Sequence, residues 1–180
     1  MIKKPYPPGQ KRKRRSSSLS EYGKELKEKQ KLKNWYGLKE TQLKKYVKEI
    51  LQKKGTVKDT GEELVKKLEN RLDNVIFKLG FVQSRSQARQ LVSHGYFLIN
   101  LKENNIPSYR VKKGDRITIR SQKLKKKIFQ NLVTYLKKHQ LPSWLQLDKE
   151  KLEGKVIGMP TFKEAMPPAE LSSIFEFYSR

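Results

Sequence analysis

Residues 84–100, SRSQARQLVSHGYFLIN, hold the signals of a short helix, a glycine stop and a strand. Ser84 is a typical N-cap residue, and Gln87 stands at the reciprocal position of a capping box. The apolar residues of the helix fall on one face: Ala88, Leu91 and Val92. Gly95 suits the left-handed position that ends a helix, and the apolar run YFLIN predicts a strand. The stretch therefore predicts a small α/β unit.

The polar face of this predicted helix carries two arginines. Arg85 and Arg89 are four positions apart, so they project from the same side. Lys78 ends the preceding predicted helix and joins them, and the helix N-terminus at Ser84 favours phosphate. Guanidinium groups bind phosphate bidentately and stack on bases, so we interpret the unit as a reader of an RNA backbone. The alternative is that these cations form only the solvated face of an amphipathic helix.

The charge of the whole chain favours the binding interpretation. The sequence has 42 Lys and Arg against 18 Asp and Glu, a formal net charge of +24. Such a charge is typical of a nucleic-acid binder. A membrane partner is disfavoured, because the basic stretches carry scattered lysines without an aromatic insertion face and no run approaches the roughly 20 apolar residues of a span. Cysteine is absent, and we predict no metal and no cofactor.

The N-terminal half predicts helices. One begins at Leu19, with Ser18 and Glu21 at capping-box spacing, and ends at Gly37. A second has an apolar stripe at Leu43, Tyr46, Val47, Ile50 and Leu51. A third is predicted to run without a break from Thr60 to Gly80, with its stripe at Leu64, Leu68, Leu72, Val75, Ile76 and Leu79.

The second half predicts small strands and one basic helix. SYRV and RITIR flank the turn KKGD and predict a hairpin, whose cations are Arg110, Lys112, Lys113 and Arg116. A helix is predicted from Gln122 to Lys138, followed by strands at WLQLD and KVIGM, a helical turn near AELSS and a terminal strand at IFEFYSR.

These elements predict an α+β fold that has a small antiparallel sheet. We expect a basic arm at residues 1–18. The arm contains KRKRR, a run that is solvated in isolation and becomes ordered on a polyanion.

The stretch RLDNVIFKLGFVQSRSQARQLVSHGYFLIN, followed by NIPSYRVKKGD, resembles the RNA-binding module named after bacterial small-subunit ribosomal protein four. PPGQ, LSEYGKELKEKQKLKNWYG, TGEELVKKLENRLDN, WLQLD, LEGKV and EFYSR resemble the family of that ribosomal protein itself, in the family's order. The resemblance implies a helical domain at 19–60, completed by about 163–180, and an inserted α/β RNA-binding domain at 61–162, with the RNA-binding module at about 71–131. It implies a structural component of the small ribosomal subunit. It also implies direct, early binding to the 5′ domain of the rRNA, and a place near the mRNA entrance beside small-subunit proteins five and three. The expected location is the ribosome of the cytoplasm, or that of an organelle.

The resemblance also assigns residues. Arg85, Arg89, Lys78 and His94 match positions of the module, and the expected rRNA contacts further include Arg71, Arg110, Lys112, Lys113, Lys31, Lys33 and Gln10. The basic segment near the mRNA entrance corresponds to Lys11, Arg12, Lys13, Arg14 and Arg15. The residues expected near protein five are Phe175, Phe177 and Tyr178. After PPGQ the family usually has His-Gly, where this chain has Lys11 and Arg12.

Two alternatives share the same module. Pseudouridine synthases place their catalytic aspartate in an Arg-Leu-Asp motif, which points to Asp73. That motif continues with Thr or Ser and Gly, whereas NVIFKLG here continues an apolar stripe, and the chain lacks room for a catalytic domain. We therefore interpret Asp73 as a helix residue paired with a cation such as Arg71, and predict no catalytic residue. A free RNA-binding stress protein would leave the helical N-terminal region and EFYSR unexplained.

Overall fold

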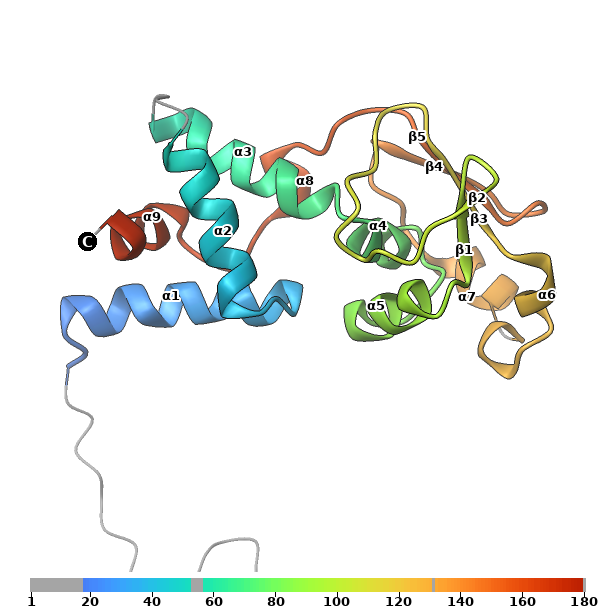
Figure 1. The fold of residues 1–180 in the computed structure, drawn as a ribbon, viewed down its shortest axis with the longest axis horizontal. Helices are drawn as coiled ribbons and strands as arrows, with labels where there is room; N and C mark the ends of the chain where they lie inside the picture. Colours follow the sequence, from blue (N-terminus) through green and yellow to red (C-terminus); the bar gives the residue numbers. More distant parts are fainter. Residues whose placement is uncertain (1–17, 53–56, 131, 180) are drawn as a thin grey trace, which may run out of the picture.

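The computed structural model describes residues 18–52, 57–130 and 132–179. The predicted contacts at Gln10 and at Lys11 to Arg15 lie outside these residues. The chain forms a helical lobe and an α/β lobe, side by side in Figure 1, and its end returns to the helical lobe. The predicted α+β class is confirmed. Within the described ranges, no helix combines the length and apolar character needed to cross a bilayer.

The helical lobe contains α1 (Glu21–Tyr36), α2 (Glu40–Leu51), α3 (Val57–Glu69), α8 (Phe162–Ala165) and α9 (Leu171–Ser179). Gly37 ends α1 as predicted, whereas the N-cap is Ser20, whose Oγ accepts a hydrogen bond from the Gly23 backbone N–H at 3.2 Å. The predicted stripe of α2 is buried at Leu43, Val47 and Ile50. These side chains share one core with α1, α3 and α9.

The prediction of a terminal strand at IFEFYSR is wrong, because the described residues of this stretch, 174–179, belong to helix α9. Leu171, Ile174 and Phe175 follow helical spacing and fill the core of the helical lobe. α9 packs along α1, so the last helix of the chain completes the lobe that contains the first helix (Figure 1).

The predicted continuous helix from Thr60 to Gly80 is interrupted between α3 and α4 (Leu72–Lys78). Arg71 is extended at the break, where the Leu72 N–H donates to the Tyr109 carbonyl and the Val111 N–H donates to the Asn70 carbonyl, each at 2.9 Å. These bonds to a distant loop replace the helical ones. Apolar residues of α3 lie in the core of the helical lobe, whereas those of α4 lie in the core of the α/β lobe. The chain therefore passes from one core to the other near residue 70, and not at the expected domain boundary between residues 60 and 61.

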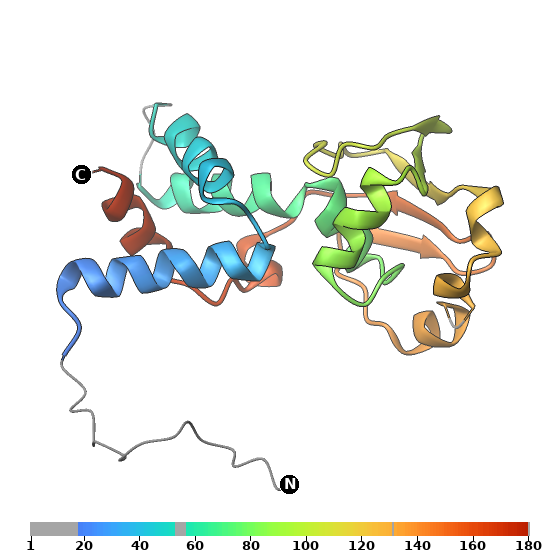
Figure 2. The same ribbon diagram turned by 60° about the horizontal axis from the view of Figure 1, so that its bottom comes forward.

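The α/β lobe packs α4 and α5 (Arg85–Ser93) over one face of an antiparallel sheet, as Figure 2 shows. The strands are β1 (Phe97–Ile99), β2 (Lys102–Glu103), β3 (Arg116–Ile119), β4 (Leu145–Asp148) and β5 (Glu153–Val156), in the order β2-β1-β3-β5-β4. The predicted SYRV–RITIR hairpin is wrong, because β3 pairs with β1 and β5, and Arg110 contributes only an isolated bridge to Arg71.

The predicted basic helix from Gln122 to Lys138 is divided into three short pieces. They are α6 (Ser121–Leu124), a 3-10 turn (Lys127–Phe129) and α7 (Leu132–Lys138). Phe129, Leu132 and Leu136 are buried against the α/β core, whereas Lys125, Lys126 and Lys127, which precede Phe129, are exposed. Packing of a few apolar residues therefore bends this segment around the lobe.

Gly80, at the end of α4, is a position where a side chain is costly. Its φ is +80°, and a Cβ there would lie 2.7 Å from His139 Cδ2. We expect Gly80→Ala to lower the free energy of unfolding by about 2 kcal/mol, measured by urea denaturation. Gly114→Ala is the matched control, because Gly114 has φ +94° but nothing within 4 Å of the added methyl. Equal losses in the two variants would mean that the His139 contact costs nothing.

Candidate nucleic-acid interface

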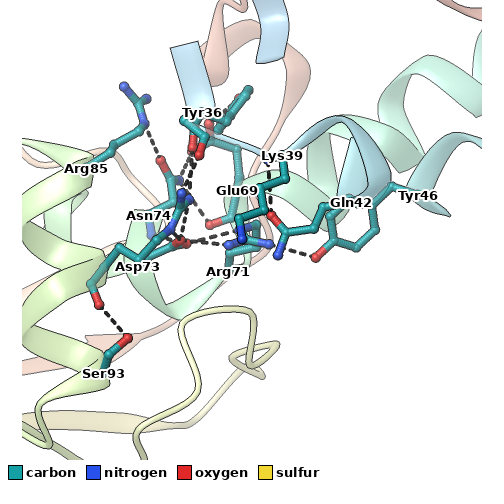
Figure 3. Close-up of polar contacts among 12 residues, drawn as sticks. Tyr36, Lys39, Gln42, Tyr46, Glu69, Arg71, Asp73, Asn74, Arg85 and Ser93 are labelled. Atoms are coloured by element: carbon teal, nitrogen blue, oxygen red, sulfur yellow. Dashed lines mark hydrogen bonds and ion pairs between the residues drawn. The ribbon is translucent and has the colours of Figure 1, made fainter. Parts of the chain in front are cut away.

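A buried polar network joins the two lobes, and we call it the lobe seam (Figure 3). Its centre is Asp73, which is 2% exposed. Arg71 donates to both carboxylate oxygens of Asp73, from Nε at 3.1 Å and from Nη2 at 2.7 Å. Arg89 of α5 donates to Asp73 Oδ2 from Nε at 3.1 Å and from Nη2 at 2.9 Å. The predicted pairing of Asp73 with Arg71 is therefore confirmed.

Arg71 is enclosed in this seam, with 2% of its surface exposed. Its Nη1 donates to the hydroxyl of Tyr46, on α2, at 2.8 Å. Burial by itself lowers the pKa of Arg71, but the hydrogen bonds and charge of Asp73 outweigh burial and raise it. The guanidinium thus stays charged and bridges the lobes from inside, although Arg71 was also expected among the rRNA contacts.

Arg89 reaches from α5 to the end of α1. Its Nη2 donates to the Tyr36 carbonyl at 3.2 Å, and its Nη1 donates to the Gly37 carbonyl. These carbonyls form the negative end of the α1 dipole, which favours a cation there. The side chain remains 31% exposed. Arg89 therefore holds two helices of different lobes together.

Arg85 lies beside Arg89, as the sequence predicts, but against aromatic rings. Its Nε donates to Asn74 Oδ1 at 2.8 Å, and its guanidinium carbon lies 4.6 Å from the ring centre of Phe77 and 4.8 Å from that of Trp35. Such cation–π contacts strengthen when desolvated. Burial lowers the pKa of Arg85. The arginine face of α5 is thus packed on α1 instead of being an open surface.

Three further side chains complete the seam. The Tyr36 hydroxyl donates to Glu69 Oε1 at 2.6 Å, and Asn74 Nδ2 donates to Glu69 Oε2 at 2.9 Å. Burial, and then the charge of Glu69, raise the pKa of Tyr36 well above its usual value. Because buried polar groups are costly unless paired, this arrangement favours one relative orientation of the lobes.

Five exposed cations of the α/β lobe lie at or next to one end of the sheet by strand register. We call this set the sheet-end cluster: Lys102, Lys112, Lys113, Arg116 and Lys155. Arg116 and Lys155 stand directly opposite each other on β3 and β5. Glu153 approaches Arg116 Nη1 only at 3.6 Å. Like charges facing each other across a sheet are unfavourable unless an anion lies nearby. The cluster is therefore a candidate phosphate site.

A second cationic surface lies on the helical lobe. A groove of about 670 Å³, which we call the lysine groove, is lined by Lys29, Gln30, Lys33, Glu40, Lys44, Lys48, Phe177 and Tyr178. Lys29 Nζ and the Tyr178 hydroxyl both donate to Glu40 Oε1, each at 2.7 Å. Lys44 and Lys48 are exposed neighbours on one face of α2. The groove unites Lys33, expected at the rRNA, with Phe177 and Tyr178, expected at a protein.

The other predicted site residues are dispersed. Lys31 pairs with Glu28, His94 is exposed at the end of α5, and exposed Arg110 reaches Glu49 Oε2 of α2 at 3.4 Å. Lys78 is half-buried beside His139. Phe175 is buried in the helical core, so its ring is not displayed to a partner as Phe177 is. The structure therefore gathers Arg71, Arg85 and Arg89 in the seam and leaves the rest on separate surfaces.

Sequence reasoning missed most partners in the seam and five of the eight residues that line the lysine groove. The missed residues are Tyr36, Tyr46, Glu69 and Asn74 in the seam, and Lys29, Gln30, Glu40, Lys44 and Lys48 in the groove. The one available signal was NRLDN, a polar run placed on a helix that was expected to be apolar. Among the described residues, no group of three His, Asp or Glu could hold a metal ion.

Comparison with known proteins covers nearly the whole chain. A family model described as the ribosomal protein S4/S9 N-terminal domain matches residues 1–69, and one described as the S4 domain matches residues 70–117. The chain is 45% identical over 178 residues to the small ribosomal subunit protein uS4 of Caldicellulosiruptor saccharolyticus, covering 99% of this chain and 84% of the relative. The protein of the same name in Thermodesulfovibrio yellowstonii is 43% identical over 175 residues, covering 97% and 82% respectively.

Proposed function

The chain belongs to the small ribosomal subunit protein uS4 family, and from this premise we propose that it binds the small-subunit rRNA directly, as an early assembly protein on the 5′ domain. Its role in the ribosome is structural, and it is not an enzyme. The observation that supports direct binding is the pair of cationic surfaces, one on each lobe, joined by the lobe seam.

The proposed mechanism is recognition of shape and phosphate. Lysines and arginines of the lysine groove and the sheet-end cluster neutralise phosphates and release counterions. Folded RNA is read largely through its backbone and its irregular regions. Because the seam favours one orientation of the lobes, the two surfaces bind only RNA segments at a matching spacing. The protein thereby holds a multi-helix junction in its assembled geometry.

Finer roles follow from the family. We propose that Lys11 to Arg15 contribute to the mRNA entrance, and that Phe177 and Tyr178 face protein five, with protein three nearby. The half-buried state of both rings is compatible with a contact at the edge of the lysine groove. The proposed location is the cytoplasmic ribosome.

No observation favours the pseudouridine synthase alternative. A catalytic aspartate must reach a base, whereas Asp73 is 2% exposed and both of its oxygens accept hydrogen bonds from Arg71. The carboxylate neutralises buried guanidinium groups and has no open side towards a substrate cleft.

Salt dependence tests the proposed binding. The full chain is titrated with RNA containing the 5′ domain of the small-subunit rRNA between 50 and 400 mM KCl, and we expect the logarithm of affinity to fall linearly with the logarithm of salt, by about 0.7–0.9 for each phosphate contact. Replacing Lys112, Lys113 and Lys155 by glutamine is expected to reduce that slope by about 2–3.

The matched control removes three exposed lysines of the helical lobe outside the groove, Lys24, Lys66 and Lys163. We expect a smaller change of slope in this variant. An affinity independent of salt, or an equal loss of slope in both triple variants, would contradict the assignment of phosphate contacts to the sheet end.

A further inference from the structure

The turn between β1 and β2 carries an apolar side chain in an unfavourable backbone conformation. Asn100 has φ +49° and Leu101 has φ +68°, and Leu101 is 84% exposed. Two-residue hairpin turns with both residues left-handed favour Asn-Gly, because a Cβ is strained in that region. Leucine at this position thus combines backbone strain with an exposed apolar surface. Strain of this kind is often tied to function.

The surrounding hydrogen bonds hold the turn in place. The Asn100 N–H donates to the Arg116 carbonyl at 2.9 Å, and the Arg116 N–H donates to Asn100 Oδ1 at 3.0 Å. Asn100 Nδ2 also donates to Asp115 Oδ1 at 2.9 Å. The turn is therefore fixed against the start of β3, and Leu101 projects from a rigid support beside Arg116.

The charges around this turn are those of the sheet-end cluster. The carboxylates nearby already have partners: Asp115 accepts from Asn100 and from the Lys112 N–H, Glu153 faces Arg116, and Glu103 lies 3.1 Å from Arg120 Nη1. The exposed Leu101 side chain, with the sheet-end cluster around it, can bind a polyanion that also has an apolar surface. RNA has both, since each nucleotide joins a phosphate to an aromatic base.

We propose that Leu101 packs on the base of an unstacked nucleotide of the bound RNA, while the sheet-end cluster holds the phosphates on either side. This inference rests on the RNA binding proposed above. Within an RNA helix the base faces are covered by their neighbours, so an apolar side chain gains a partner only at a loop, bulge or junction. The turn would therefore recognise an irregular feature of the RNA that lysines alone do not distinguish.

The test compares the Leu101→Gly variant with the unaltered full-length chain, in thermal stability and in affinity for the same 5′-domain RNA. Glycine relieves the left-handed strain, so we expect Tm to rise by about 2–4 °C. Loss of the apolar contact is expected to weaken RNA binding about tenfold. The salt slope is expected to stay unchanged, since no phosphate contact is removed. Leu101→Asn tolerates the same backbone without an apolar side chain and is expected to lose affinity equally.

Met166→Gly is the matched control. Met166 is also left-handed, with φ +38°, and 77% exposed, but it lies at the end of α8 in the helical lobe. We expect this variant to gain stability and keep its RNA affinity. An unchanged RNA affinity of Leu101→Gly overturns the proposal. The proposal is also overturned if Leu101→Gly weakens binding to an acidic protein but not to the RNA. Failure of the unaltered chain to bind the RNA would instead overturn the proposed function.

Discussion

Replacing Asp73 by alanine is expected to lower the free energy of unfolding by about 3–5 kcal/mol. Arg71 is 2% exposed in the unaltered chain, and the variant removes both acceptors of its bidentate pair. Arg89 loses the same carboxylate. A buried guanidinium without a counter-ion destabilises the fold. This desolvation cost is larger than the loss of the ion-pair attraction itself. Urea denaturation followed by circular dichroism measures the difference.

Two further variants make this test specific. Glu150→Ala removes an exposed carboxylate of the β4–β5 turn and is expected to change stability by no more than about 0.5 kcal/mol. The double variant Arg71→Met, Asp73→Leu removes both charges together, and we expect it to recover much of the loss of Asp73→Ala. If Asp73→Ala costs as little as Glu150→Ala, the buried ion pair is not what stabilises the junction of the lobes.

Short sequence motifs predict the structure correctly where hydrogen bonds between nearby residues determine it. Ser84 caps α5, and its Oγ accepts from the Gln87 N–H at 3.2 Å, as the opening stretch predicts. The interruption at Arg71 had no such signal, because the apolar stripe runs on through it and the bonds that replace the helix come from Tyr109 and Val111. The stretch IFEFYSR is predicted as a strand, but its described residues are helical and pack against α1.

The candidate site shows the same division. That Arg85 and Arg89 share a face follows from helical spacing alone. What lies opposite that face does not follow, because Tyr36 is 53 positions away from Arg89 in the sequence. The lysine groove likewise combines α1, α2 and α9, and no local pattern links Lys44 to Phe177. Sequence therefore indicates which residues carry charge, whereas the fold determines whether that charge meets RNA or another helix.

Arg85 and Arg89 offer the sharpest test of this distinction, and replacing both by alanine is expected to weaken binding of the 5′-domain RNA by roughly 10²-fold. Under the proposal of a lobe seam, these side chains orient the two cationic surfaces and do not touch phosphate. Their loss frees the lobes, so binding by one surface no longer positions the other. The affinity then falls at every salt concentration, and the salt slope is nearly constant.

Direct phosphate contact makes different predictions for the same residues. Two lost contacts would reduce the salt slope by about 1.4–1.8. The double replacement by lysine separates the hypotheses further, because it keeps both charges but not the planar guanidinium geometry. Lysine Nζ is not expected to bind Asp73 and the Tyr36 carbonyl together as Arg89 does. If the seam is what matters, the lysine variant binds as weakly as the alanine variant. Near-complete binding by the lysine variant would identify the arginines as phosphate ligands.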